Sequence, residues 1–245
     1  DTTLNRPWVF RAAFLDPFQG RVMASFVQEE FGAQTAAVLY DIASDYPKGL
    51  AENFRDAFTE QGGEIVGFES FTTGDTDFSA QLTKIAEVNP DVIFTPQYYN
   101  EVPLIVQQAR ELGIEAPITG SDSWGFPELI DLCGEACEGL FYSTHYAPDI
   151  ATDVAQNFIT AYEERFGEKP DDVAALTYDA FQMLFKAMQD AGQLDKTAIR
   201  DALQAIDRFE GVTGTMSFDE QGDPTKCAVI IQIKDGAFTY YDQAC

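Results

Sequence analysis

Three loops of the predicted sheet carry aromatic and acidic side chains that could bind a small cation. Tyr46 follows one predicted strand, Tyr98 and Tyr99 follow another, and Asp122 and Trp124 follow a third. Ligands of an open parallel sheet bind beyond the carboxyl ends of its strands, so these loops are expected to meet at one rim. A carboxylate pairs with an ammonium group, and aromatic rings contact the cation or an adjacent apolar group. The pattern therefore predicts a site for a small molecule that carries an ammonium group.

Each of these side chains also has a purely structural interpretation. Tyr46 could pack on the start of its own helix, Tyr98 could bury its ring and solvate its hydroxyl, and Asp122 could form an Asx turn. Their common position at the carboxyl ends of predicted strands favours the ligand site over these interpretations.

The sequence carries little that resembles a catalytic centre. His145 is the only histidine, no serine lies in a G-x-S-x-G elbow, and no glycine-rich phosphate loop follows a predicted strand. Paired carboxylates such as Asp171 and Asp172 arise by chance among 41 acidic residues. The acidic loop at residues 219–224 lacks the spacing of an EF-hand and is expected to be a plain turn. We therefore expect no enzyme activity, no catalytic residues, no metal and no cofactor.

The composition excludes several classes of function. With 15 Lys and Arg against 41 Asp and Glu, the formal charge is −26, which opposes binding to nucleic acid. Hydrophobic residues make up 45% of the chain, enough for a sizeable core, so global disorder is excluded. The longest apolar runs, such as residues 227–231, are far shorter than the roughly 20 residues of a membrane helix. The acidic charge indicates a solvated surface, and docking of a basic partner is the alternative.

The four cysteines fall into two close pairs, Cys133 with Cys137 and Cys227 with Cys245. The second pair brackets a predicted hairpin, whose two ends should lie near one another. Two disulfides and an oxidising compartment are favoured over four buried thiols, and a zinc site is the third alternative. No charged and apolar leader precedes Asp1, so we expect that a signal peptide was either never present or has been removed.

The elements that would position the candidate site alternate between strands and helices. Short runs rich in β-branched and aromatic residues predict buried parallel strands. These runs lie at residues 35–40, 64–71, 91–95, 116–120 and 138–143. Segments with apolar residues at helical spacing predict helices at residues 48–61, 77–89 and 102–112. The alternation is that of consecutive βα units, so the fold class is α/β with a doubly wound sheet.

After residue 146 the pattern changes from alternation to a run of helices. The three predicted helices lie at residues 154–166, 173–191 and 196–206. Only two strand-like segments, residues 9–14 and 212–218, are left to cover their apolar faces. Residues 227–245 predict a hairpin that turns at Asp235 and Gly236. The residues therefore predict one complete α/β lobe and about half of another.

Several longer segments together match one known family. The most specific are YYNEVPLIVQQARELG at residues 98–113 and GSDSW at residues 120–124. Others are LYDIASDYPKGLAENF, EGLFYSTHY and GVTGTMSFDEQGD. Through these segments, which extend over nearly the whole chain, the sequence resembles the periplasmic solute-binding proteins of branched-chain amino acid ABC transporters, of the Leu/Ile/Val-binding type.

This resemblance implies the type I periplasmic binding protein fold, with two lobes that are joined by three crossings and close on a ligand like a hinge. The crossings would fall near Leu15, Tyr146 and Asp223. The partial first lobe would comprise residues 1–16 and 147–223, and the second lobe residues 17–146 and 224–245. The opening βα units of the family are missing, so we expect a fragment that lacks the N-terminal part of the first lobe.

The resemblance also implies roles for the candidate site residues. Tyr46 and Tyr98 match pocket tyrosines of the family, and Asp122 matches the acidic residue that binds the α-ammonium of the ligand. Aspartate stands here where the best-known members have the longer glutamate. Tyr99 and Trp124 are further candidates at the rim. The groups that bind the ligand carboxylate in the family would lie in the missing region.

The implied function is capture of a small amino acid, of the branched-chain type, between two lobes and its delivery to an ABC permease. This would take place in the periplasm or outside the cell, with membrane contact only through the permease or a lipid anchor. An alternative is the ligand-sensing domain of a receptor or of an amide-responsive regulator with the same fold. A third hypothesis is that this chain alone binds nothing, because half of the cleft is absent.

Overall fold

A computed structural model describes residues 2–150 and 152–245, and the chain divides into two compact units. Unit 1 comprises Asp1–Leu15, His145–Val229 and Cys245, and unit 2 comprises Asp16–Thr144 and Ile230–Ala244. The lobe boundaries at residues 16, 146 and 223 stay a prediction.

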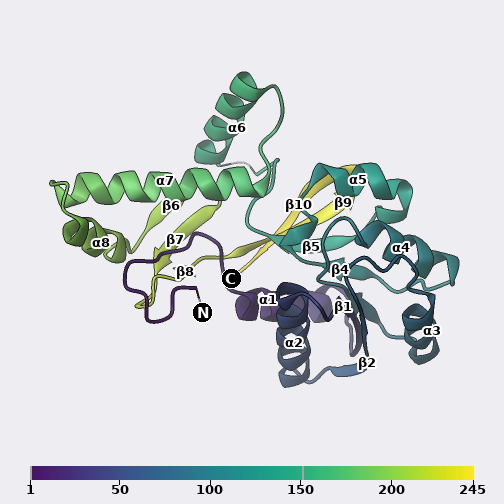
Figure 1. The fold of residues 1–245 in the computed structure, drawn as a ribbon. Coiled ribbons are helices and arrows are strands. Elements are labelled where there is room, and N and C mark those ends of the chain that lie inside the picture. The colour runs from purple at the N-terminus through teal and green to yellow at the C-terminus, as the bar shows by residue number, and fades with distance from the viewer. Residues whose placement is uncertain (1, 151) are drawn as a thin grey trace. The chain divides into compact units, whose positions relative to one another are not determined.

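Unit 2 is built on a seven-stranded sheet with the order β10-β9-β5-β4-β3-β1-β2 (Figure 1). The strands are β1 (Thr35–Asp41), β2 (Glu64–Phe71), β3 (Val92–Phe94), β4 (Ile118–Gly120), β5 (Phe141–Thr144), β9 (Ala228–Lys234) and β10 (Ala237–Ala244). Strands β1 to β5 pair in parallel, and β3 and β4 are completely buried. The five predicted parallel strands are therefore confirmed, but the predicted burial is wrong for β2, which lies at the edge of the sheet and is only partly buried.

Helices cover both sides of this sheet. Helices α1 (Asp16–Phe31) and α2 (Asp45–Glu60) pack together, and α3 (Ser79–Val88), α4 (Val102–Glu111) and α5 (Pro127–Cys133) follow one another on the other side (Figure 1). Close packing of α1 on α2 requires a glycine at position 20, because a Cβ there would lie 2.8 Å from the Phe54 nitrogen. The predicted helices α2, α3 and α4 are confirmed, whereas α1 and α5 are absent from the prediction.

The last two strands form the predicted hairpin at one edge of the sheet. Its turn residues Asp235 and Gly236 have φ values of 53° and 68°. Positive φ at both central residues is the requirement of a tight two-residue hairpin turn, which Asp-Gly meets at little cost. The local sequence therefore accounts for the position of this turn.

Unit 1 combines three helices with a small antiparallel sheet. The helices are α6 (Asp153–Phe166), α7 (Asp172–Ala191) and α8 (Lys196–Gln204), and the strands are β6 (Phe209–Gly211), β7 (Gly214–Phe218) and β8 (Pro224–Thr225). The side chains of Thr152, Asp171 and Asp195 cap the three helices by accepting hydrogen bonds from first-turn amides. Gly167 and Gly192 end α6 and α7 in the left-handed conformation.

The strand predicted at residues 9–14 is wrong. This segment forms no strand, and its Arg11 amide donates a hydrogen bond to the Gly222 carbonyl (3.1 Å). The Arg11 guanidinium pairs with Asp223 (2.9 Å), which also accepts a hydrogen bond from the Thr3 hydroxyl (2.7 Å). The segment is thus held by side-chain contacts and by a turn, and not by the strand hydrogen bonds that were expected.

Helices α6 and α7 expose much of their apolar surface. A groove of about 910 Å³ runs along them, lined by residues that include Phe166, Tyr178, Phe181 and Phe185. Phe166 and Phe181 are 59% and 54% exposed, values typical of polar surface residues. The prediction that the nearby sheet is too small to cover these helices is confirmed for unit 1.

Unit 1 also buries a cluster of charged side chains. Asp179 of α7 accepts hydrogen bonds from the amides of Val212 and Thr213 (both 2.8 Å) and from the Thr213 hydroxyl (2.7 Å). The Lys226 ammonium donates to the same hydroxyl (2.6 Å). Burial lowers the pKa of Lys226 from 10.5 to about 8, against the opposite effects of Asp179 and Asp172. The cluster therefore ties α7 to the turn between β6 and β7.

The lowered pKa of Lys226 predicts a stability that depends on pH. Between pH 8 and pH 10.5 the unfolded chain binds more protons at this residue than the folded chain does, so alkaline pH favours folding there. The difference in the free energy of unfolding between the wild type and Lys226→Met should therefore change across this window, in favour of the wild type, by up to about 3 kcal/mol. Urea unfolding of both proteins from pH 7 to pH 10 measures this difference, and a difference independent of pH would contradict the assignment.

Candidate functional site

The carboxyl ends of β1, β3 and β4 carry the candidate ligand-binding residues. Tyr46 lies in the first turn of α2, which follows β1. Tyr98 and Tyr99 lie between β3 and α4. Asp122 begins the short 3-10 helix η1 (Asp122–Trp124) directly after β4. Because these three strands are neighbours in the parallel sheet, their following loops share one edge of unit 2.

The structure brings three of the five candidates into contact. The Tyr46 hydroxyl donates a hydrogen bond to the Asp122 carboxylate and lies 2.8 Å from Ser121 Oγ. The rings of Tyr46 and Tyr98 lie 5.5 Å apart, with an angle of 37° between their planes. Tyr98 is 39% exposed, so this aromatic pair is open to solvent on one side. An acidic group beside two aromatic rings is thus present at the sheet edge.

The electrostatics of Tyr46 make it a donor in this site. Burial and the negative charge of Asp122 raise the pKa of Tyr46 well above its ordinary value of 10, and hydrogen bonds from Ser121 and Ser123 act in the opposite direction. The phenol therefore stays protonated at neutral pH. Its single proton points to the carboxylate, which can only accept.

The other two candidates pack against the rest of unit 2. The Tyr99 ring lies 4.9 Å from the ring of Phe126. Trp124 is fully buried, with its ring 6.1 Å from that of Tyr142. A Cβ at Gly120 would overlap the Trp124 ring, so the glycine of GSDSW makes room for the indole. Trp124 therefore lies in the core beneath the site, and its predicted position at the rim is wrong.

Polar side chains that were not predicted as part of the site lie behind the Tyr46–Asp122 pair. The Ser123 hydroxyl donates to the Gln97 carbonyl (2.9 Å), and Ser121 Oγ lies 3.2 Å from Ser123 Oγ. Both serines are buried. The Ser-Asp-Ser order of residues 121–123, after a predicted buried strand, is the signal that could have found them, because buried hydroxyls need partners.

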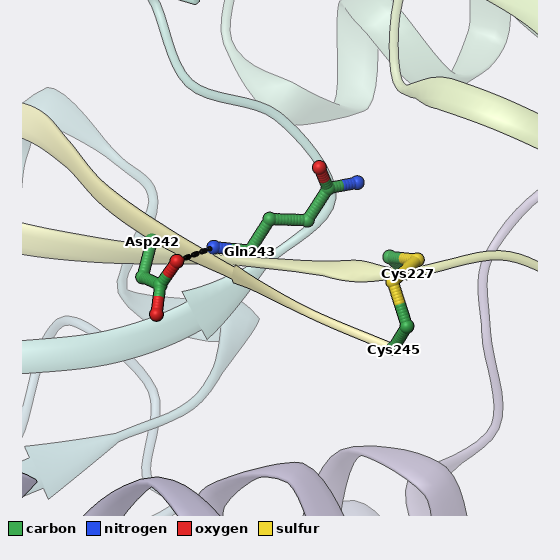
Figure 2. Close-up of a disulfide and its surroundings, with 4 residues drawn as sticks. All are labelled: Cys227, Asp242, Gln243 and Cys245. Atoms are coloured by element: carbon green, nitrogen blue, oxygen red, sulfur yellow. Dashed lines mark hydrogen bonds between the residues drawn. A yellow bond between two sulfur atoms is a disulfide. The ribbon is translucent and has the colours of Figure 1, made fainter.

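Both cysteine pairs form disulfides in the structure. Cys133 at the end of α5 is bonded to Cys137 of the 3-10 helix η2 (Gly134–Cys137), and Cys227 is bonded to Cys245. Figure 2 shows the second bond, which joins the residue before β9 to the residue after β10, beside Asp242 and Gln243. The described residues contain no cluster of three or more His, Cys, Asp or Glu that could hold a metal ion.

Removal of the Cys227–Cys245 disulfide is expected to cost more stability than removal of the Cys133–Cys137 disulfide. The two bonds close loops with sequence separations of 18 and 4 residues, and loop-closure entropy grows with loop length. The Cys→Ser double variants should lose about 3 and about 2 kcal/mol of unfolding free energy, respectively. Urea unfolding without reductant measures both, and a larger loss from the shorter loop would contradict this prediction.

Unit 2 is a doubly wound α/β unit, and proteins with this architecture bind ligands at the carboxyl ends of the parallel strands. The chain belongs to the periplasmic binding protein family, whose model matches residues 1–237. The predicted α/β type I periplasmic binding protein fold is confirmed and is partial relative to longer relatives. In the part of the chain that is described, no helix has both the length and the apolar character to cross a membrane.

Several known proteins are similar to this chain. The leucine binding protein LivK from Thermotoga maritima is 40% identical, with a TM-score of 0.91 over 99% of this chain and 69% of that chain. The branched-chain amino acid transporter substrate binding protein LivJ from Streptococcus pneumoniae, in complex with isoleucine, is 34% identical, with a TM-score of 0.86 over 99% of this chain and 68% of that chain. The leucine-, isoleucine-, valine-, threonine- and alanine-binding protein of Pseudomonas aeruginosa is 28% identical over 235 residues, 96% of this chain and 60% of that protein.

These relatives bear on the predictions in two ways. They are binding proteins by name, which agrees with the expectation that the chain is not an enzyme. This chain spans 60–63% of the length of the first curated relatives that it matches.

Proposed function

We propose that this chain belongs to an extracytoplasmic solute-binding protein that captures a small amino acid of the branched-chain type. The observation that carries the proposal is the contact between Tyr46 and Asp122 at the carboxyl ends of parallel strands. It is supported by family membership and by relatives that are named for binding leucine, isoleucine and valine. No covalent chemistry is involved.

Each contacting residue has a distinct role in this proposal. Asp122 pairs with the α-ammonium group of the ligand, and Tyr46 holds the carboxylate by donating a hydrogen bond to it. The half-exposed Tyr98 ring, which lies tilted beside the Tyr46 ring, supplies an apolar contact for the ligand. We assign ligand contact to these three residues and a supporting role to Trp124, because its ring is buried.

The proposal extends to the partner and the compartment. The ligand would be held between the two predicted lobes, residues 1–16 with 147–223 and residues 17–146 with 224–245, and passed to an ABC permease. A periplasmic or extracellular location agrees with two disulfides, because such bonds persist in oxidising compartments. It also agrees with the family of the chain.

Calorimetric titration of the full-length gene product tests this function. The panel contains the twenty amino acids together with a few simple aliphatic amides that carry no α-ammonium group. Heat of binding is expected with leucine, isoleucine and valine, and none with an amide that lacks an α-ammonium group. A response to amides alone would overturn the amino acid assignment and favour a sensor with the same fold.

A further inference from the structure

A row of four oxygen contacts leads from the candidate site into the core of unit 2. It begins at the Asp122 carboxylate, which accepts the Tyr46 hydroxyl proton. Tyr46 Oη lies 2.8 Å from Ser121 Oγ, which lies 3.2 Å from Ser123 Oγ. The row ends at the Gln97 carbonyl, 2.9 Å from Ser123 Oγ. Ser121 and Ser123 are 0% and 9% exposed, so these groups depend on one another for hydrogen bonds.

The hydroxyl proton of Ser121 can be donated to either of two neighbouring oxygens in this row. The three hydroxyls carry one proton each, while the groups at both ends, a carboxylate and a carbonyl, can only accept. Tyr46 must donate to Asp122, and Ser123 must donate to Gln97. Two contacts, with Tyr46 and with Ser123, are then left for the single proton of Ser121.

Each choice of the Ser121 proton has a different effect on the site. Donation to Tyr46 polarises the phenol and strengthens its hydrogen bond to Asp122, because linked hydrogen bonds reinforce one another. Donation to Ser123 leaves the Tyr46 oxygen without a hydrogen bond from Ser121, so that this oxygen can accept an N–H group from a ligand. In both states Ser121 acts on Asp122 through the Tyr46 hydroxyl.

We propose that Ser121 is a positioning residue for ligand binding, which orients the Tyr46–Asp122 pair through its hydroxyl. Ser123 supports it by fixing its own proton on the Gln97 carbonyl. The proposal rests on the proposed function, because it concerns the group that meets the ligand ammonium. It adds that the affinity for the ligand depends on the Ser121 side chain, which is completely buried and does not contact the ligand itself.

A double-mutant cycle between Ser121→Ala and Tyr46→Phe in the full-length protein tests the proposal. Ser121→Ala is expected to raise the Kd for leucine about 3- to 10-fold in the wild-type background, the loss of one buried hydrogen bond. In the Tyr46→Phe background, where the hydroxyl is absent, it should change Kd less than about 2-fold. Ser121→Cys, which keeps a weak donor of similar size, should lie between wild type and Ser121→Ala.

A matched control separates positioning from a general loss of structure. Ser143 at the end of β5 is also buried, and its hydroxyl accepts a hydrogen bond from Gln19 (3.0 Å). Ser143→Ala should lower the urea midpoint without changing Kd. Equal effects of Ser121→Ala on Kd in both backgrounds, or an equal effect of Ser143→Ala, would overturn the proposal.

The urea midpoint distinguishes failure of this proposal from failure of the proposed function. Ser121→Ala should shift the midpoint less in the Tyr46→Phe background than in the wild type, with no ligand present. If the wild type binds no amino acid, the proposed function fails together with the role of Ser121 in binding. Additive midpoint shifts would overturn the contact between Ser121 and Tyr46 in either case.

Discussion

Asp122→Ala is expected to weaken leucine binding by the full-length protein at least about 100-fold, a loss of about 3 kcal/mol or more. The ammonium group of the ligand would lose its counter-charge, and removing one partner of a hydrogen-bonded charge pair is costly. Calorimetric titration of the wild type and the variant measures the loss.

Two further variants show whether the charge of Asp122 is the cause. Asp122→Asn keeps the shape and still accepts a hydrogen bond from Tyr46, so it should fold as the wild type does and yet bind nearly as poorly as Asp122→Ala. Asp131→Ala removes an exposed carboxylate from the neighbouring helix α5 and should leave the affinity unchanged. An unchanged affinity in Asp122→Ala would return this residue to the structural Asx-turn interpretation.

Asp179→Ala is expected to lower the free energy of unfolding by about 3 to 5 kcal/mol. The substitution leaves the buried backbone amides of Val212 and Thr213 without their hydrogen-bond acceptor. It also removes the carboxylate whose charge offsets the buried ammonium of Lys226. Urea unfolding at pH 7 measures the loss.

Two companion variants assign this loss to the buried cluster. Asp190 lies on the same helix and forms an exposed ion pair with Lys186. Asp190→Ala should therefore lower the free energy of unfolding by less than about 1 kcal/mol. Lys226→Met in the Asp179→Ala background should restore part of the stability, because no unpaired charge stays buried. A loss no larger than that of Asp190→Ala would show that the cluster contributes little.

Local sequence determined most of the helices and strands. Thr152, Asp171 and Asp195 cap their helices, because the first amides of a helix have no partner within it. Asp235 and Gly236 tolerate the positive φ of the hairpin turn. Apolar runs and helical periodicity located five strands and three helices of unit 2. This was possible because the spacing of apolar residues along the sequence reflects which face of an element is buried.

Two segments whose structure depends on distant contacts, α1 and residues 9–14, were missed or wrongly predicted. Helix α1 buries Gln19 and Gly20 along with its apolar residues, so its buried face does not show as an apolar stripe. Residues 9–14 have the composition of a strand, but a strand exists only where another strand supplies hydrogen-bond partners. The Arg11 pair with Asp223 and the turn at Gly222 hold this segment instead.

The sequence by itself determined the family, the α/β class and the edge of the sheet where the candidate residues lie. These follow from residue types and from the rule that loops after parallel strands share one edge. Only the tertiary structure decided that Tyr46 bonds to Asp122, 76 residues away, that Trp124 is buried, and that two serines lie behind the pair. The physical reason is that hydrogen-bond partners and burial are set by side chains brought together in space, and local order along the chain does not encode which of them meet.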